Sequence, residues 1–189
     1  MRPYRLHMAI TLRALTDADV AAHLAGEDAE MVRWLSGGVG TVESTKAWFD
    51  HLAVNARSGR GKQGLGVLLD DRLAGYVEFD AGPHPDHQPG DVQISYGVHP
   101  WARGRGIAVE AVGLVLAHLR AHAVGTRAVL RIEPANRASV RVAEKSDFAY
   151  VGEFVSATHR DPDGNPATLR LYERAVTRST GMSRDVFAS

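Results

Sequence analysis

The sequence predicts a mixed α+β fold, in which helices lie on both faces of a largely antiparallel sheet with one central parallel pair of strands. Segments with the two-residue alternation of strands are interspersed with segments of helical periodicity along the 189 residues. Two strand patterns, 92–98 and 128–132, flank one helical pattern, so these strands should run parallel with a right-handed crossover. The last two strand patterns flank a turn at 161–166 that contains proline and glycine, which predicts a closing hairpin.

The first half of the chain should form two helices and then a meander of three strands. Thr16 is a suitable N-cap, and Asp19 stands three residues later, at the capping-box position. Pro100 should end the last strand of the meander, because proline has no N–H for the ladder. The expected elements are a strand at 10–13, a helix from the Thr16 cap to about 25, a helix at 45–56, and strands at 64–69, 73–80 and 92–98.

The second half should continue with two helices and three strands. Ile107, Ala111, Val115 and Leu119 recur at helical spacing, and Asn136 is a suitable N-cap. No repeat or low-complexity linker divides the chain, so we expect one domain over 1–176 and a weakly ordered tail over 177–189. The expected elements are a helix at 107–123, a strand at 128–132, a helix from the Asn136 cap to about 145, and strands at 148–158 and 168–175.

The composition is typical of a globular protein and argues against several classes of function. With 22 basic and 22 acidic residues, the formal net charge is 0, which disfavours nucleic acid or an anionic membrane as the main partner. Cysteine is absent, so a disulfide framework, a thiolate nucleophile and a zinc ribbon are excluded. The sequence shows neither a signal-peptide pattern nor an apolar stretch of membrane-spanning length, and we expect a cytoplasmic protein.

A glycine-rich turn, Arg103-Gly104-Arg105-Gly106-Ile107-Ala108, stands between a predicted strand and a predicted helix. Gly104 and Gly106 let the backbone approach an anion and tolerate positive φ. The first turn of the helix offers N–H groups without intrahelical partners, together with the positive end of the helix dipole. Arg103 and Arg105 add formal positive charge beside it. The turn is therefore expected to bind a diphosphate, mainly through its backbone.

Three kinds of phosphate-binding turn compete as explanations. A P-loop requires Ser or Thr after its Lys, but the nearest run, Gly59-Arg60-Gly61-Lys62-Gln63, has Gln in that place. A Rossmann turn requires a third small residue for close helix–strand packing, and Val109 stands there. The third pattern, Q/R-x-x-G-x-G/A, is met by Arg103, Gly106 and Ala108.

With this third pattern, the chain resembles the GNAT superfamily of acetyl-CoA-dependent N-acetyltransferases. More narrowly, it is similar to the branch typified by the ribosomal-protein N-terminal acetyltransferases RimJ and RimL, over roughly residues 11 to 174. Asp147 departs from the resemblance, because the family usually has Gly there. Asp tolerates the left-handed backbone that this position would need, although less easily than Gly. The matching segments are 96–108, 110–111, 133–142 with its N-x-x-S helix start, and 144–148.

The resemblance implies an acyl-CoA N-acyltransferase fold with acetyl-CoA as co-substrate. The two central parallel strands would splay apart, and the pantetheine arm would enter the gap and pair with the backbone of strand 92–98. A backbone N–H near Val98 would polarise the thioester carbonyl, and Asn136 would hydrogen-bond the arm. The residues implied in cofactor binding are Tyr96, Val98, Arg103, Gly104, Arg105, Gly106, Ile107, Ala108, Asn136 and Ser139.

The same resemblance implies direct attack of an amine on the thioester in a ternary complex. Many members of the superfamily protonate the leaving thiolate with a Tyr, but that position falls near Ala143 here. In the RimJ/RimL-like branch a Ser at the position of Ser139 is the expected donor, although Ser139 could instead only help to cap its helix. For the group that takes the proton of the amine, Glu78, Asp91 and loss to water stay open.

Several other polar residues have simpler explanations than catalysis. His99 stands at a strand end just before a proline and is expected to serve that turn. His84, Asp86 and His87 lie in a loop and match no zinc signature, so no metal is expected.

The predicted function is acetyl transfer from acetyl-CoA to a primary amine, either a protein N-terminus or a small-molecule amine. Two alternatives stay open, namely a non-catalytic acyl-CoA-binding regulatory module on this fold and an enzyme that uses NAD or ATP.

Loops should determine which amine the enzyme accepts, and Trp34 with Leu35 could line the pocket for that amine. The acidic run 27–30 would suit a cationic amine, but a solvated helix end is the simpler explanation. Expected partners are acetyl-CoA and the amine, without nucleic acid or membrane, for a monomer or homodimer.

Overall fold

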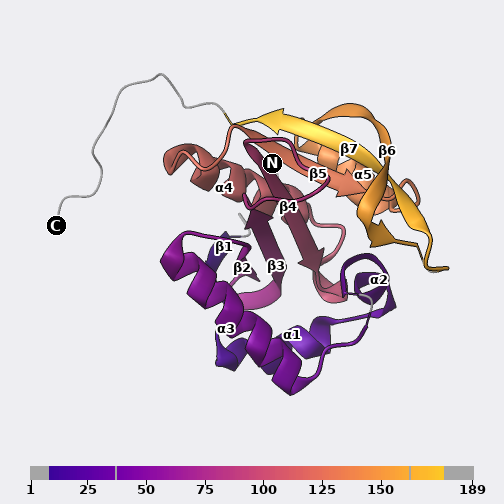
Figure 1. The fold of residues 1–189 in the computed structure, drawn as a ribbon. Coiled ribbons are helices and arrows are strands. Elements are labelled where there is room, and N and C mark those ends of the chain that lie inside the picture. Colours follow the sequence, from indigo (N-terminus) through magenta and orange to yellow (C-terminus); the bar gives the residue numbers. More distant parts are fainter. Residues whose placement is uncertain (1–8, 37, 162, 177–189) are drawn as a thin grey trace, which may run out of the picture.

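The computed structural model describes residues 9–36, 38–161 and 163–176. Over these residues the strands form one seven-stranded sheet in the order β1-β2-β3-β4-β5-β7-β6. Neighbouring strands are antiparallel except for β4 and β5, which are parallel. In Figure 1, α1, α2 and α3 gather on one side of the sheet, and α4 lies apart from them. The mixed α+β class predicted from the sequence is confirmed.

Each predicted strand and helix is present, with bounds that shift by a few residues. The strands are β1 (Ile10–Ala14), β2 (Gln63–Leu69), β3 (Arg72–Asp80), β4 (Asp91–Val98), β5 (Arg127–Ile132), β6 (Ala149–Arg160) and β7 (Pro166–Ala175). The α-helices are α1 (Val20–Gly26), α2 (Ala29–Met31), α3 (Val42–Ser58), α4 (Ile107–Ala121) and α5 (Arg137–Lys145). Three short helical turns complete the set: η1 (Asp17–Asp19), η2 (Val32–Ser36) and η3 (Pro100–Ala102).

Local sequence explains where the helices begin and end. The backbone N–H of Thr16 donates to the Asp19 carboxylate at 2.9 Å, which confirms the predicted capping box ahead of η1 and α1. Gly59 ends α3 in the left-handed conformation, with φ of 63°. At the start of α5, the Asn136 side chain accepts a hydrogen bond from the Ser139 N–H at 3.0 Å.

The segment formed by α2 and η2 has no counterpart among the predicted elements, because it is too short for helical periodicity to show. Asp28 caps it by accepting a hydrogen bond from the Met31 N–H at 3.0 Å. Met31 is buried and fixes the segment against the sheet. The segment carries Trp34 and Leu35, which the sequence offered as walls of a pocket.

Side chains on β3 alternate between two cores, as the two-residue period of a strand requires. Val77 and Phe79 belong to a core that also contains the apolar stripe of α4. Tyr76 belongs to a second core, together with residues of α1 and α3 such as Val20 and Phe49. Helices therefore cover both faces of the sheet. Glu78 shares the direction of Tyr76 and is also buried.

The parallel strands β4 and β5 separate after a short contact. Asp91, Val92 and Gln93 pair with residues 127–129, and the pairing ends there. The rest of β4 keeps its pairing with β3 on the other side. Consequently, the backbone from Ile94 to Val98 has a free edge that faces a gap in the sheet. This is the splayed pair that the resemblance implied.

No helix within the described residues is long and apolar enough to cross a membrane. The predicted weakly ordered tail at 177–189 and the first eight residues lie outside the part of the chain that the structure describes.

Candidate active site

Two grooves meet where β4 and β5 separate. The α4 groove, ≈ 400 Å³ in volume, runs along the end of β4, the turn before α4 and one face of α5. The β5 groove, ≈ 260 Å³, lies among β3, β4, β5 and β6. The residues common to both walls are Trp34, Leu35, Tyr96, Asn136 and Ser139. A molecule in one groove can therefore touch a molecule in the other at this junction.

The turn at the mouth of the α4 groove has the geometry of an anion site. Gly104 and Gly106 have φ of 76° and 81°, in the left-handed region that favours glycine. A Cβ built at either position would meet no atom within 4 Å, so the space beside the turn is open. The first hydrogen bond of α4 runs from the Glu110 N–H to the Gly106 carbonyl. The N–H groups before Glu110 in this first turn are thus not used by the helix, as at any helix start.

Arg103 lines the α4 groove, but its guanidinium is already paired. It donates to Asp28 at 2.7 and 2.8 Å, to Glu30 at 2.9 Å and, through Nε, to the Val98 carbonyl at 3.0 Å. This pairing lowers the pKa of Asp28 to about 2. Two carboxylates therefore compensate the Arg103 charge in this structure, and its role beside an anion stays a prediction. The side chain instead ties α2 and η2 to the end of β4.

Two further cations lie in the wall of the α4 groove. Arg105 is exposed, and the wall of the α4 groove is formed without it. Arg141 and Lys145 lie in this wall, one helical turn apart on α5. The sequence analysis missed them, although residues 137, 141 and 145 are all basic and their four-residue spacing on a helix predicts one charged face.

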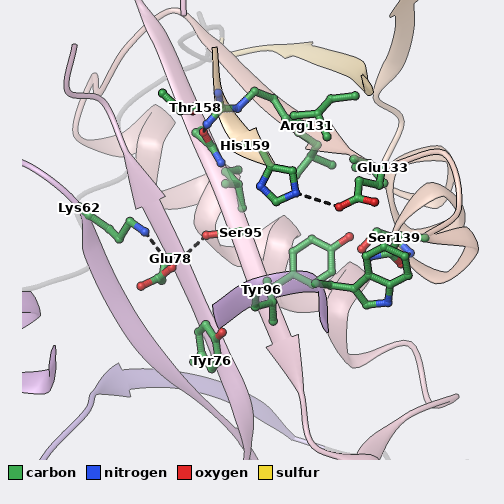
Figure 2. Close-up of a pocket in the computed structure, with 18 residues that line it drawn as sticks. Lys62, Tyr76, Glu78, Ser95, Tyr96, Arg131, Glu133, Ser139, Thr158 and His159 are labelled. Carbon is green, nitrogen blue, oxygen red and sulfur yellow. Dashed lines mark hydrogen bonds and ion pairs between the residues drawn. The ribbon is translucent and has the colours of Figure 1, made fainter. Parts of the chain in front are cut away.

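The junction of the grooves holds the hydroxyl groups of Tyr96 and Ser139, which lie close together in Figure 2. Burial raises the pKa of Tyr96 to about 12, and a hydrogen bond with the Ser139 side chain acts in the opposite direction. The two hydroxyl groups therefore interact at the junction. Because Asn136 caps α5, Ser139 is not needed for the cap and its side chain faces both grooves.

Glu78 lies on the β3 side of the β5 groove with both oxygens engaged. Its Oε1 accepts from Trp48 Nε1 at 3.1 Å, and its Oε2 accepts from Ser95 Oγ at 3.0 Å. The ammonium of Lys62 is 3.5 Å from the same Oε2 (Figure 2). Lys62 belongs to the glycine-rich run that resembles a P-loop, and the structure places it at this carboxylate instead.

A second acidic group, Glu133, lies across the groove from Glu78. Its Oε1 is 2.8 Å from Nε2 of His159, as the dashed line in Figure 2 shows. Glu133 follows the end of β5, and His159 lies near the end of β6. Neither was singled out as catalytic from the sequence. The alternation of β6 could not have indicated His159, because the strand is irregular at this point.

Several candidates from the sequence lie away from the grooves. Asp91 is buried at the opposite end of β4 in an ion pair with Arg127 at 2.7 Å. His99 is buried, and burial lowers its pKa to about 4. Asp86 pairs with Arg131 at 3.0 Å. Among the residues that the structure describes, no group of three acidic or histidine side chains is arranged to hold a metal.

The comparison with protein families decides between the kinds of phosphate-binding site. The model of the family described as "Acetyltransferase (GNAT) domain" matches residues 9–149, which include the turn and both parallel strands. The chain belongs to the GNAT acetyltransferases. A search of curated proteins gave no match.

Solved GNAT structures share the fold of this acetyltransferase at low sequence identity. A RimL ribosomal L7/L12 α-N-protein acetyltransferase in complex with coenzyme A has a TM-score of 0.75 and 20% identity over 88% of this chain and 93% of that one. RimJ of Mycobacterium smegmatis, in complex with a CoA-disulfide, has a TM-score of 0.75 and 22% identity over 88% of this chain and 81% of that one. The aminoglycoside acetyltransferase AAC(6')-Ib in complex with coenzyme A has a TM-score of 0.70 and 19% identity over 88% of this chain and 95% of that one. The RimJ/RimL-like branch that the motifs indicate is thus among the structural neighbours of this GNAT chain.

Proposed function

We propose that this GNAT acetyltransferase transfers the acetyl group of acetyl-CoA to a primary amine by direct attack in a ternary complex. The observation that carries this proposal is the meeting of the two grooves at Ser139, through the gap that opens where β4 leaves β5. One groove suits a long phosphorylated co-substrate, and the other suits a small polar group. Their junction is where the thioester and the amine would meet.

The residues along the α4 groove would suit the successive parts of acetyl-CoA. The open turn at Gly104 and Gly106 would hold the pyrophosphate on backbone N–H groups at the positive end of α4. Arg141 and Lys145 would add positive charge. The free edge of β4 would pair with the amide groups of the pantetheine arm like an added strand. Tyr96 and Asn136 would offer polar groups at the inner end, and a backbone N–H near Val98 would polarise the thioester carbonyl.

The β5 groove fits a protonated amine. We propose that Glu78 holds the ammonium, because its carboxylate lines the groove and both of its oxygens are fixed by hydrogen bonds. Aromatic walls from Trp34 and Tyr76 would enclose the carbon skeleton next to that charge. Ser139, at the junction, would return a proton to the sulfur of the leaving CoA, directly or through water.

The acceptor is proposed only as a class, a protein N-terminus or a small-molecule amine. RimL acts on a ribosomal protein and AAC(6')-Ib on aminoglycosides, as their names state. The groove walls of this chain, with one carboxylate on each side, suit either kind of amine. The cytoplasmic location and the monomeric or homodimeric state predicted from the sequence stay predictions.

The proposed function is tested by amine-dependent release of the CoA thiol. Purified protein is mixed with acetyl-CoA and one amine in each reaction. The amines are a peptide with a free N-terminal serine, 1,4-diaminobutane and kanamycin, and the product masses are measured by mass spectrometry. We expect at least one amine to gain a single acetyl group as thiol appears. Tight binding of acetyl-CoA without acetylation of any amine would instead support the alternative of a non-catalytic acyl-CoA-binding module.

A further inference from the structure

The pair of His159 and Glu133 lines the β5 groove, but the function proposed so far gives it no catalytic role. The contact of 2.8 Å joins His159 Nε2 to Glu133 Oε1. A carboxylate only accepts hydrogen bonds, so this contact places hydrogen on Nε2 and leaves the lone pair on Nδ1. A carboxylate that fixes the tautomer and orientation of an imidazole in this way prepares the ring to accept a proton.

A distortion of β6 positions this histidine. Val155 pairs with Thr168 and Arg160 pairs with Pro166, so the stretch from Ser156 to His159 stands opposite Ala167 alone. An insertion of this kind breaks the alternation of the strand and re-aims its side chains. Without it, the ordinary register would continue to the end of the hairpin, and His159 would take a different position.

A buried network holds the distortion in place. Asp86 accepts hydrogen bonds from Ser156 Oγ at 2.6 Å and from the Ala157 N–H at 3.0 Å. The Ser156 hydroxyl in turn accepts from the N–H groups of Thr158 and His159. Ser156 is 1% exposed, and the Asp86 carboxylate is paired with Arg131. Every backbone N–H from Ala157 to His159 is thus satisfied by a side chain rather than by the ladder.

This network is better explained by positioning than by stability. A buried ion pair such as Asp86 with Arg131 repays little more than the cost of removing its charges from water. Here, Asp86 comes from the loop before β4 and holds Ser156 and Ala157, while the Ser156 hydroxyl holds the N–H groups of Thr158 and His159. As a result, His159 is held in the β5 groove, and the Glu133 carboxylate contacts its ring from behind.

We propose that His159 is the catalytic base of the reaction, with Glu133 as its positioning residue. His159 takes one proton from the ammonium, directly or through one water, and the neutral amine attacks the thioester carbon. The C–N bond forms, the C–S bond breaks, and the second proton of the nitrogen reaches the sulfur by way of Ser139. His159 then releases its proton to solvent. Glu78 holds the ammonium.

This inference rests on the proposed function and is tested with the amine that the wild-type enzyme acetylates best. The variants are His159→Gln, which keeps a hydrogen-bonding side chain but cannot serve as the base, and Glu133→Gln. His51→Gln, an exposed histidine on α3 that contacts Asn55, is the matched control. Removal of a general base lowers turnover by about 100-fold or more, so we expect His159→Gln to lose at least that factor in kcat. Glu133→Gln should also lower kcat, because the tautomer of His159 is then no longer fixed, and the control should match the wild type.

Two further readouts separate a base from a residue that only supports the fold. The calorimetric Kd for acetyl-CoA should be unchanged in both groove variants, because neither side chain lies in the α4 groove. Imidazole added to His159→Ala should restore part of the lost kcat, since the position opens to solvent. Unchanged kcat in His159→Gln, or no rescue by imidazole, overturns the role of His159 and leaves the proposed function intact. A wild-type protein that acetylates none of the amines overturns both.

Discussion

Two single residues have clearly separate proposed roles in this site, Ser139 in acetyl transfer and Gly106 in cofactor binding. Ser139 stands where the grooves meet, and the helix behind it is capped by Asn136. Gly106 has a left-handed backbone, with open space where a Cβ would stand. Both residues can therefore be changed with a defined effect on one step, binding or transfer, and little effect on the core.

Replacing Ser139 by Ala should lower turnover without weakening cofactor binding. Loss of a proton donor to the leaving group costs about 100-fold in kcat. The Kd for acetyl-CoA should stay within about 2-fold, because the backbone turn and the α5 cations are untouched. Steady-state kinetics and calorimetry measure the two quantities. Unchanged kcat would remove Ser139 from the mechanism.

Replacing Gly106 by Glu should abolish binding of acetyl-CoA, because a carboxylate would project into the space for the pyrophosphate. Gly164→Glu is the matched control. Gly164 also has positive φ, at 85°, and no atom within 4 Å of a built Cβ, but it lies in the last hairpin. Both variants carry similar backbone strain, so a loss of binding confined to Gly106→Glu reports the anion site. Equal affinity in the two variants would refute this placement.

At the scale of elements, helices and strands with clear periodicity could be predicted, and irregular segments could not. The caps at Thr16 and Asn136 are local patterns and were found. Asp147 has φ of 54°, which confirms the left-handed conformation expected where the family has Gly. The α2 and η2 segment and the distortion of β6 depend instead on distant partners, Arg103 and Asp86. No local pattern could indicate these two segments. His159, on the second segment, was therefore missed, whereas Trp34, on the first, was offered from the sequence as a pocket wall.

The end of α4 offers a test of backbone strain at the same scale. Ala123 follows the helix with φ of 54°, a conformation that costs an L-residue about 1 kcal/mol. Ala123→Gly should therefore raise the free energy of unfolding by ~1 kcal/mol. Ala121→Gly, at the last helical residue, should lower it by ~0.5–1 kcal/mol. Urea titrations measure both, and a fall in stability for Ala123→Gly would contradict the assigned strain.

At the scale of the whole molecule, the family and its cofactor could be predicted from the sequence, whereas most of the acceptor side could not. The turn at 103–108 is continuous in sequence, so a local sequence pattern is enough to predict what it binds. The β5 groove is assembled from β3, β4, β5, β6 and η2, and its polar residues Glu78, Glu133 and His159 become neighbours only through the topology of the sheet. The insertion of β7 between β5 and β6 is part of that topology and has no local signature.

Buried histidines make the stability of the whole fold dependent on pH. Burial lowers the pKa of His99 to about 4 and also lowers the pKa of His23, which lies beside it in the second core. In the unfolded chain these groups bind protons near pH 6.5, so the unfolded state gains protons first as the pH falls. The contribution of these histidines to the free energy of unfolding should be fully present above about pH 6.5. It should be lost as the pH falls towards 4, by ~3 kcal/mol for His99 alone.

Urea midpoints measured from pH 7 to pH 4.5 check this dependence. The partly buried His84 and His118, whose pKa values burial also lowers, add to the same slope. Carboxylates with a lowered pKa, such as Asp28, contribute only below this range, because their stabilisation is lost when the pH falls below about 4. His51→Gln should keep the full slope, since His51 is exposed. A flat profile between pH 7 and 4.5 would be inconsistent with neutral buried histidines.

The central claim is that the α4 groove is built for the diphosphate and pantetheine of coenzyme A. Isothermal calorimetry of the wild-type protein with acetyl-CoA, CoA, NAD and ATP in parallel tests it most directly. We expect micromolar binding of acetyl-CoA and CoA and no binding of NAD or ATP at the same concentrations. Absence of acetyl-CoA binding, or a preference for NAD or ATP, would contradict the assignment of the turn at 103–108 and the mechanism that depends on it.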